Sequence, residues 1–308
     1  MPTEQSSTPC QRAYRAVFFD LDGTLLPMDI DEFLGAYYRR LGAFTVAHGY
    51  DAEAFSAALT AGTRAMMRHG ACTNEEAFWE TFLSRMDTDR GAIMAVLEEF
   101  YETDFGRIGD GVRPSEGMVR AVRTLHDKGY PLVLATMPLF PPRAVAWRLA
   151  WAGLDAGMFA RLTTYDNSTS TKPKMAYYAE NIAAADLRGA DVLMVGNNTV
   201  EDLAAMNLGA DAYLVTDYLL DGIGFDLATV KHGSAEQFAA WVETLPACAD
   251  PARAIAAGPV DPALTQVVLE RDLAPDMPAD ADLERSARAA YKDVASVSPD
   301  VLPGDDAR

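Results

Sequence analysis

The chain has few cysteines and no long apolar run. Its 308 residues include only Cys10, Cys72 and Cys248, which are widely spaced and form no CxxC pair. This pattern indicates neither a disulfide framework nor a zinc site. No stretch of about 18 or more apolar residues occurs, so nothing in the sequence predicts a membrane span. The first residues, MPTEQSSTPCQR, are polar and lack the apolar core of a signal peptide, so we expect a cytoplasmic protein.

Positive charge is also scarce. The chain has 26 Lys and Arg against 45 Asp and Glu, which gives a net charge of −19. Sequence-independent binding to nucleic acid needs a basic face that displaces counterions, and docking on anionic membranes needs basic clusters. We therefore expect neither a nucleic-acid partner nor a membrane partner. An acidic surface remains compatible with a local site for a phosphorylated small molecule.

Apolar residues are plentiful, at 49% of the chain, and the length suggests about two domains. Short apolar runs predict buried strands, and helical patterns lie between them. The strands are expected at 14–19, 131–136, 161–165, 191–196 and 212–216. This alternation predicts an α/β fold with a doubly wound, mainly parallel, Rossmann-like sheet that helices cover on both faces.

Four amphipathic helices interrupt the predicted sheet after its first strand. Apolar side chains recur at steps of three and four from Ile30 to Phe44, which gives the first helix one apolar face. Thr73 and Glu76 form a capping-box pattern that opens the third helix. The short connections between the helices are typical of a small bundle. We therefore expect an inserted helical cap domain at residues 28–108.

The α/β core domain is expected to be discontinuous and to combine residues 1–27 with residues 109–247. After residue 250 the composition shifts, because this last stretch holds 7 of the 17 prolines and an excess of acidic residues. Apolar stretches at 263–269 and 282–291 can dock as short segments. The rest of residues 248–308 is expected to form a loosely held, acidic, proline-rich tail.

Four polar clusters lie at or just beyond the predicted strand ends. In an open parallel sheet, ligands bind at the carboxyl ends of the strands, near the point where the strand order reverses. The clusters are DLDGT at 20–24, Thr136, Lys172-Pro173, and Gly196-Asn197-Asn198 with Asp202. Their positions predict that they meet at one edge of the sheet and form the active site.

The first cluster contains two carboxylates suited to phosphoryl chemistry. Asp20 and Asp22 point toward the same edge, because Leu21 between them takes the opposite face. One carboxylate can attack phosphorus to give an aspartyl phosphate, and the other can protonate the leaving oxygen and later activate water. Two carboxylates and a phosphate repel one another, so we expect Mg²⁺, whose preference for oxygen ligands suits Asp20 and a phosphate oxygen.

The other clusters supply groups that bind phosphate. Gly23 lets the backbone turn and, with Thr24 beside it, offer N–H groups to a phosphate. Thr136 supplies a hydroxyl donor. Lys172 supplies a point charge both to the phosphoryl group and to the nucleophile.

In the order and spacing of these clusters, residues 14–245 resemble the haloacid dehalogenase-like hydrolase superfamily, in its helical-cap subclass and phosphatase branch. The resemblance implies that Asp20 is the nucleophile and Asp22 the general acid and base. It further implies that Thr136 binds the phosphoryl group and that Lys172 is the lysine shared by the superfamily.

The fourth cluster departs from the superfamily pattern, in which an aspartate usually follows the glycine directly. This chain has Asn197 there, and an amide oxygen can ligate Mg²⁺ without contributing charge, so weaker metal binding is expected. Asn198 or Glu201 could share the task. The metal ligands that the resemblance implies are Asp20, Asp22, Asn197 and Asp202.

These features predict a Mg²⁺-dependent phosphatase that hydrolyses a small phosphorylated metabolite, as a monomer or a homodimer. One alternative is another chemistry on the same fold, namely a phosphomutase or a dehalogenase. A second alternative is a non-catalytic member that binds a phosphorylated ligand or a protein partner, and only Asn197 supports it. The sequence does not identify the substrate.

Overall fold

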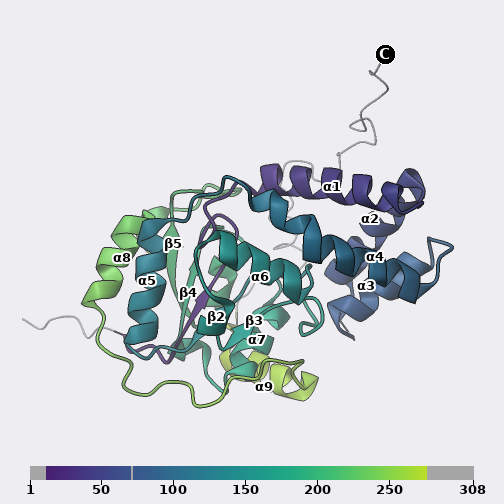
Figure 1. Cartoon of the computed structure of the whole chain (residues 1–308). Coiled ribbons are helices and arrows are strands. Elements are labelled where there is room, and N and C mark those ends of the chain that lie inside the picture. Colours follow the sequence, from purple (N-terminus) through teal and green to yellow (C-terminus); the bar gives the residue numbers. More distant parts are fainter. Residues whose placement is uncertain (1–11, 71, 276–308) are drawn as a thin grey trace, which may run out of the picture.

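A six-stranded sheet forms the core of the computed structural model, which describes residues 12–70 and 72–275. All neighbouring strands are parallel, in the order β3-β2-β1-β4-β5-β6 (Figure 1). The strands are β1 (Ala16–Phe19), β2 (Leu132–Leu134), β3 (Arg161–Leu162), β4 (Val192–Gly196), β5 (Asp211–Val215) and β6 (Lys231–Gly233). The predicted doubly wound α/β fold is confirmed. The edge strand β6 is additional, and its polar sequence KHG carries no apolar pattern that could have indicated it.

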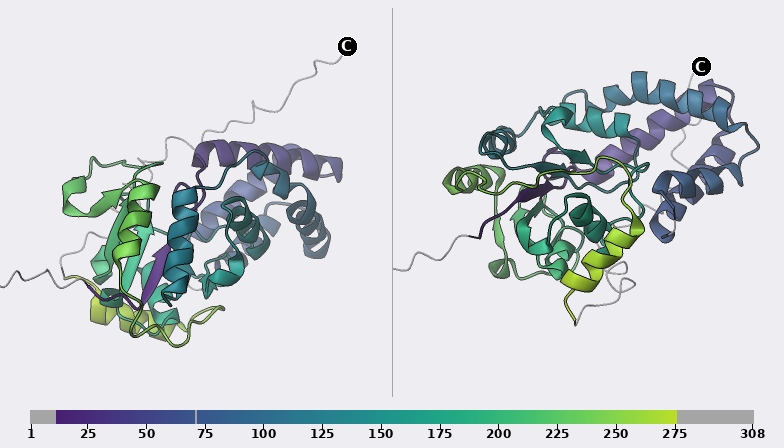
Figure 2. Two further views of the ribbon diagram at one scale, coloured as in Figure 1. Left: turned by 60° about the vertical axis from the view of Figure 1, so that its left-hand side comes forward. Right: turned by 90° about the horizontal axis from the view of Figure 1, so that it is seen from below.

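Helices cover both faces of the sheet (Figures 1 and 2). Val17 and Phe19 of β1 pack in the apolar cluster that contains residues of α5 (Glu116–Asp127), α6 (Pro142–Trp151) and α8 (Ala235–Thr244). Ala16 and Phe18 point to the other face and pack with α7 (Met175–Ala184) and α9 (Pro262–Asp272). Side chains of a strand alternate between faces, so a strand buried on both sides is apolar throughout.

Four helices lie between β1 and α5 in the chain, and we call them the helical cap. They are α1 (Ile30–Ala47), α2 (Ala52–Arg68), α3 (Asn74–Leu83) and α4 (Arg90–Thr103). They gather at one end of the molecule, on the right of Figure 1. Both bonds of the expected capping box between Thr73 and Glu76 are present at the start of α3. Asn74 holds this helix against the core, because its Nδ2 donates to the carbonyl oxygens of Pro138 (3.0 Å) and Ser170 (3.3 Å).

Two elements of the core differ from the expected helices. The helix expected near 200–208 is a 3₁₀-helix, η4 (Leu203–Leu208). The residues just before η4 form a tight loop, in which Asn198 Oδ1 accepts hydrogen bonds from the amides of Val200 and Glu201. These side-chain hydrogen bonds compete with those of a regular helical turn. Helix α5 begins after Ser115, whose side chain caps it, rather than at Pro114.

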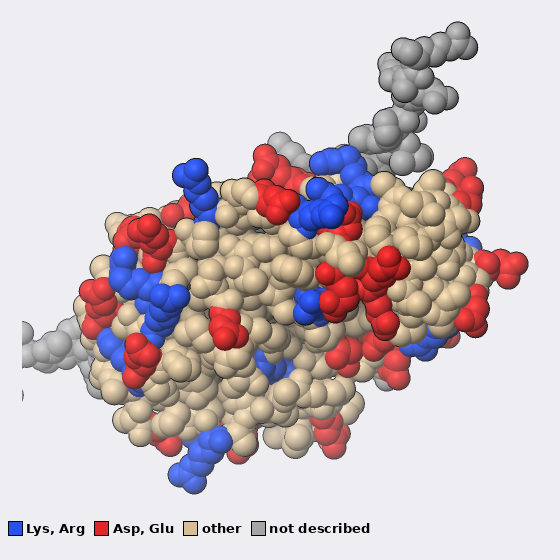
Figure 3. Space-filling model, viewed as in Figure 1, with Lys and Arg blue, Asp and Glu red and all other residues tan. Residues whose placement is uncertain are grey.

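The surface distributes its charge unevenly over the face shown in Figure 3. Side chains of both signs lie over the helical cap and over α5 and α8, where Arg120 and Glu236 form an ion pair (2.6 Å). Between these regions lies a broad area with few charged side chains. Within residues 12–70 and 72–275, no helix combines the length and the apolar character that a membrane crossing requires.

Residues 252–272 differ from the loosely held tail that their composition suggests. The amide of Ala252 donates to Arg15 O (3.0 Å), and that of Ala256 donates to Ala184 O (2.8 Å). Helix α9 packs on α7 through Val268, which is 3% exposed. The apolar stretch 263–269 therefore docks as a helix, while the stretch 282–291 and the rest of 276–308 lie outside the described residues.

Arg161 explains why this segment matters for stability. Its side chain is buried, and Nη1 donates to the carbonyl oxygens of Ala256 and Gly258, both at 2.7 Å. Without this segment Nε and Nη2 would keep Asn181 Oδ1 (2.9 Å) and Asn167 O (3.0 Å), but Nη1 would lose both of its acceptors, and an unpaired donor of a buried charged group is costly. Truncation after residue 250 is therefore expected to lower the free energy of unfolding by about 3 kcal/mol or more. Denaturant unfolding of the chain 1–250 against a matched chain 1–275 measures this loss, and equal midpoints would contradict it.

Candidate active site

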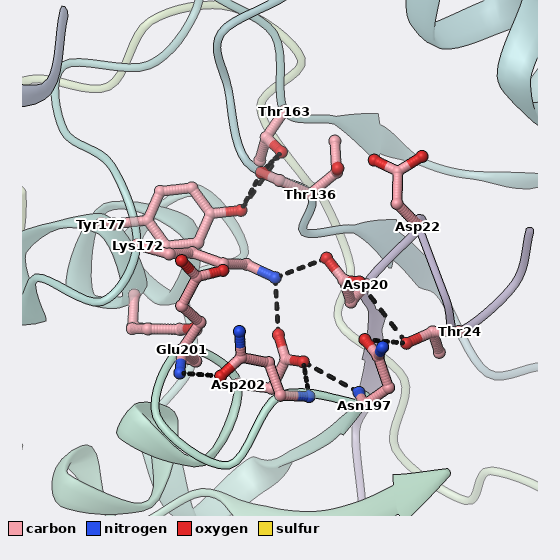
Figure 4. Close-up of polar contacts among 12 residues, drawn as sticks. Asp20, Asp22, Thr24, Thr136, Thr163, Lys172, Tyr177, Asn197, Glu201 and Asp202 are labelled. Atoms are coloured by element: carbon pink, nitrogen blue, oxygen red, sulfur yellow. Dashed lines mark hydrogen bonds and ion pairs between the residues drawn. The ribbon is translucent and has the colours of Figure 1, made fainter. Parts of the chain in front are cut away.

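The predicted polar clusters meet at the carboxyl edge of the sheet (Figure 4). Asp20 directly follows β1, Thr136 lies beyond β2, and Asn197 directly follows β4. Since β1 lies between β2 and β4, the loops after these three strands are neighbours. The strand order reverses at this point, where doubly wound sheets bind their ligands.

Lys172 links two of the acidic residues at the centre of this site. Its Nζ donates to Asp20 Oδ1 at 2.7 Å and to Asp202 Oδ1 at 2.6 Å, and its side chain is 1% exposed. The expected proximity of the lysine to Asp20 is therefore present in the structure. Lys174, the other lysine of this loop, instead contacts the cap, where it donates to Met67 O.

The charges of this group are not balanced. Burial raises the pKa of Asp20 to about 7, with Lys172 opposing the rise and Asp202 adding to it. Burial lowers the pKa of Lys172, but the two carboxylates outweigh it and raise that pKa well above its usual value. Burial is therefore the main reason that the pKa of Asp20 rises, and the two carboxylates are the reason that the pKa of Lys172 rises. Two carboxylates share one ammonium, which leaves one negative charge uncompensated. The site is therefore suited to accept additional positive charge.

Two glycines allow the loops to approach one another closely. A Cβ on Gly196 would lie 2.1 Å from Asp202 Oδ2, the atom that accepts hydrogen bonds from the amides of Asn197 and Asn198, both at 2.9 Å. A Cβ on Gly23, whose φ is 78°, would lie 2.3 Å from Asn197 Nδ2. Any larger residue at either position would push the site apart.

The oxygens of Asp20 and Asn197 fit a hard cation. Thr24 Oγ1 lies 3.1 Å from Asn197 Oδ1 and 3.4 Å from Asp20 Oδ2, so its hydroxyl holds these two oxygens near each other. Asn197 Nδ2 donates to Tyr218 O, which orients the amide so that its oxygen faces Asp20. A carboxylate and an amide oxygen at one point are ligands that Mg²⁺ accepts.

The other ligands implied by the resemblance are engaged differently. Both oxygens of Asp202 accept hydrogen bonds, from Lys172 and from two backbone amides, and Asn198 Oδ1 caps the loop. Among residues 12–70 and 72–275, no group of three or more His, Cys, Asp and Glu side chains is arranged to hold a metal. Asp20 and Asn197 are therefore the residues best placed to hold Mg²⁺, with Asp202 orienting Lys172.

Asp22 has a separate partner that the sequence did not indicate. Arg148 Nη1 donates to Asp22 Oδ2 at 2.6 Å. Burial raises the pKa of Asp22, and the Arg148 guanidinium opposes that rise. The available signal was the position of Arg148 on the apolar face of its helix, beside Val145 and Leu149, where an arginine needs a buried partner.

Thr136 lies above Asp20 in Figure 4, on the side where Asp22 also lies. Its carbonyl oxygen accepts hydrogen bonds from Thr163 Oγ1 and Tyr177 Oη, both at 2.8 Å. These two residues were also missed by the sequence analysis. They fix the backbone that carries Thr136, because a carbonyl with two donors has little freedom to rotate.

A family model described as haloacid dehalogenase-like hydrolase matches residues 14–209, which is well over half of the chain. The chain therefore belongs to the haloacid dehalogenase-like hydrolase family, as the resemblance of its four clusters predicted. No curated protein matches the chain significantly.

Several solved structures share the architecture at low sequence identity. L-2-haloacid dehalogenase from Xanthobacter autotrophicus is 20% identical with a TM-score of 0.40, over 85% of this chain and all of that one. CbbY from Rhodobacter sphaeroides, in complex with phosphate, is 19% identical with a TM-score of 0.45, over 73% and 96%. A predicted phosphoglycolate phosphatase from Haemophilus somnus is 14% identical with a TM-score of 0.44, over 73% and 96%. Likeness at this level does not select one activity.

Proposed function

We propose that this hydrolase is a Mg²⁺-dependent phosphatase that acts on a small phosphomonoester through an aspartyl phosphate on Asp20. The observation that carries the proposal is the second buried carboxylate, Asp22, placed two residues after the first. A halide leaves carbon as a stable anion, whereas an alkoxide leaving phosphorus needs a proton near neutral pH. Asp22 can supply that proton, and halide displacement has no use for it.

The residues divide the reaction into two balanced steps. In the first, an Asp20 oxygen bonds to phosphorus, the ester P–O bond breaks, and Asp22 gives its proton to the leaving oxygen. In the second, Asp22 takes a proton from water, the water oxygen bonds to phosphorus, and the bond to Asp20 breaks. Inorganic phosphate leaves, and both carboxylates are restored.

The surrounding residues serve these steps electrostatically. Lys172 keeps a positive charge beside Asp20 throughout. Thr136 offers a hydroxyl donor to the phosphoryl oxygens. The backbone N–H groups expected to join it at Gly23 and Thr24 instead donate to Leu26 O (2.8 Å) and Leu21 O (3.2 Å), because the loop turns back on itself there. When bound, Mg²⁺ would offset the repulsion between the Asp20 carboxylate and the phosphate. The expected partner is a small phosphorylated metabolite.

One assay separates this proposal from its alternatives. The purified full-length chain is offered 4-nitrophenyl phosphate, alkyl phosphates and 2-chloropropionate, each with Mg²⁺ and with EDTA. We expect phosphate release that requires Mg²⁺ and no chloride release. Chloride release that ignores EDTA would favour a dehalogenase, and an absence of any turnover would favour a non-catalytic binding protein.

The metal site makes a prediction of its own. Asn197→Asp is expected to lower the Mg²⁺ concentration for half-maximal activity about fivefold, because one added charge beside a divalent ion is worth on the order of 1 kcal/mol. Asn198→Asp is the matched control, since it adds the same charge one residue away on a side chain that caps the loop. Mg²⁺ titrations of both variants measure the effect, and an unchanged or raised requirement in Asn197→Asp would place Asn197 away from the ion.

A further inference from the structure

We propose that Arg148 binds a second anionic group of the substrate, so that the preferred substrates are phosphomonoesters whose alcohol itself carries a carboxylate or a phosphate. The inference rests on the proposed phosphatase activity and narrows its substrate class. It is carried by hydrogen-bond donors of Arg148 that have no partner, and by the position of these donors beside Asp22.

Arg148 is buried with most of its donors unused. Its side chain is 1% exposed, and Nη1 donates to Asp22 Oδ2. Its Nε and Nη2 atoms are buried without a hydrogen-bond partner in the part of the chain that the structure describes. A guanidinium has five N–H donors, and leaving buried donors of a charged group unpaired is costly. Such donors indicate an acceptor that arrives with a ligand.

Aromatic rings cannot satisfy these donors. The guanidinium carbon lies 4.5 Å from the ring centroid of Phe140 and 5.4 Å from that of Phe33. Contact with a ring face stabilises the cation, but the N–H groups lie at the edge of the guanidinium and need an acceptor in its plane. A carboxylate or a phosphate matches this planar fork with two parallel hydrogen bonds.

The position of Arg148 fixes which end of the substrate it can contact. A general acid must come within about 2.6–3.2 Å of the leaving oxygen. Asp22 Oδ2 is engaged by Arg148, so the buried and unpartnered Oδ1 is the oxygen available for that contact within the described residues. The guanidinium then lies on the order of 5–8 Å from the leaving oxygen. An anionic group two or three bonds along the alcohol falls within this reach.

Arg148 also lies where the helical cap meets the α/β core, which favours its contact with the alcohol part of a substrate. Phe33 belongs to cap helix α1, whereas Arg148 belongs to core helix α6 and Asp22 follows β1. With phosphorus at Asp20 and the leaving oxygen at Asp22, the alcohol of a substrate would be directed toward this junction, because Asp22 contacts Arg148 there. Arg148 is the charged residue that it would meet there, with three N–H groups free.

Matched substrates test the inference directly on the wild-type chain. 3-Phosphoglycerate is compared with glycerol 3-phosphate, and propane-1,3-diol bisphosphate with propyl phosphate, so that the two pairs separate a carboxylate from a phosphate as the second anion. In at least one pair, we expect kcat/KM to be about 10- to 100-fold higher for the substrate that carries the second anionic group, because charge-assisted hydrogen bonds in a buried site are strong. 4-Nitrophenyl phosphate provides the reference activity.

Variants then test whether Arg148 causes the preference for substrates with a second anionic group. Arg148→Met should reduce the ratio of kcat/KM within the favoured pair to near one, and Arg148→Lys should retain part of it. Arg143→Met is the matched control, because Arg143 is an exposed arginine on the same helix that pairs with Glu102. It should leave the ratio unchanged.

The outcomes are distinct. Equal kcat/KM within both pairs for the wild-type chain would overturn the inference even if Arg148→Met fails to fold. Equal fractional losses for both members of the favoured pair in a folded Arg148 variant would also overturn it and leave Arg148 as a positioning residue for Asp22. If the wild type hydrolyses no phosphomonoester, including 4-nitrophenyl phosphate, the proposed function itself is refuted and this inference falls with it.

Discussion

Asp20→Asn is expected to lower phosphomonoester turnover by about 10⁴-fold or more, because an amide cannot act as the nucleophile. The fold should persist, because the asparagine oxygen can still accept a hydrogen bond from Lys172. Lys172 also retains its ion pair with Asp202. Burial raises the pKa of Asp20 to about 7, so its charge costs folding free energy once the pH exceeds its ordinary value near 3.8. At pH 8 the neutral variant should therefore unfold at a temperature at least as high as the wild type.

Steady-state rates and thermal unfolding on the same preparations measure both effects. Asp211→Asn is the matched control, because Asp211 is a partly buried carboxylate at the opposite, amino end of β5, paired with Lys231 at 2.6 Å. It should retain full turnover. Comparable rates for Asp20→Asn and the wild type, once contaminating phosphatase is removed, would remove Asp20 from the nucleophile role.

The meeting of the polar clusters in the candidate site could be predicted because a parallel sheet brings strand ends together. Asp20, Thr136 and Asn197 are far apart in the chain, but recognising the strands was enough to place them at one edge of the sheet. That β1 lies between β2 and β4, which makes the three residues neighbours, is known from the structure. The lysine was harder to place from topology, since it lies in a loop. Its position was predicted from the resemblance and is now accounted for by its two ion pairs.

The remaining residues could not be predicted because their roles depend on tertiary distances. Arg148 is 126 positions from Asp22, and its helix shows only an apolar periodicity with Arg148 on the apolar side. Whether Asp202 faces a metal or Lys172 depends on the loop that carries it. Because Gly196 has no side chain, the Asp202 carboxylate can turn back and accept hydrogen bonds from two backbone amides. The docking of residues 252–258 depends on hydrogen bonds from buried Arg161 to the carbonyl oxygens of Ala256 and Gly258, which composition does not reveal.

The helical cap is connected to the catalytic loops more closely than its amphipathic pattern indicated. Asn74 is fully buried and bridges the carbonyl oxygens of Pro138, just beyond Thr136, and Ser170, just before Lys172. One asparagine at the start of α3 therefore contacts both loops that carry the proposed phosphate-binding residues. The pattern predicted the helix and its capping box, but a side chain at the first helical position gave no indication of this contact.

Asp22→Asn is expected to slow the first step with alkyl phosphates by about 10²–10⁴-fold, and with aryl phosphates by less than about tenfold. Nitrophenolate is a stable anion and departs with little need of a proton, whereas an alkoxide is a poor leaving group without one. Asparagine is chosen because its oxygen can still accept from Arg148 Nη1, so the buried guanidinium keeps its partner. Loss of the proton donor is then the main change.

The measurement must isolate the first step, because Asp22 also activates water in the second. Hydrolysis of the aspartyl phosphate should be slowed equally whichever alcohol has left, so steady-state rates for the two substrate classes would converge. Single-turnover release of nitrophenolate and of a labelled alkyl alcohol, each with enzyme in excess, separates the classes. A large and equal loss for both would mean that Asp22 acts on the phosphoryl group or on its surroundings rather than on the leaving oxygen. Aryl release that stays fast while alkyl release collapses is the pattern that a general acid at Asp22 requires.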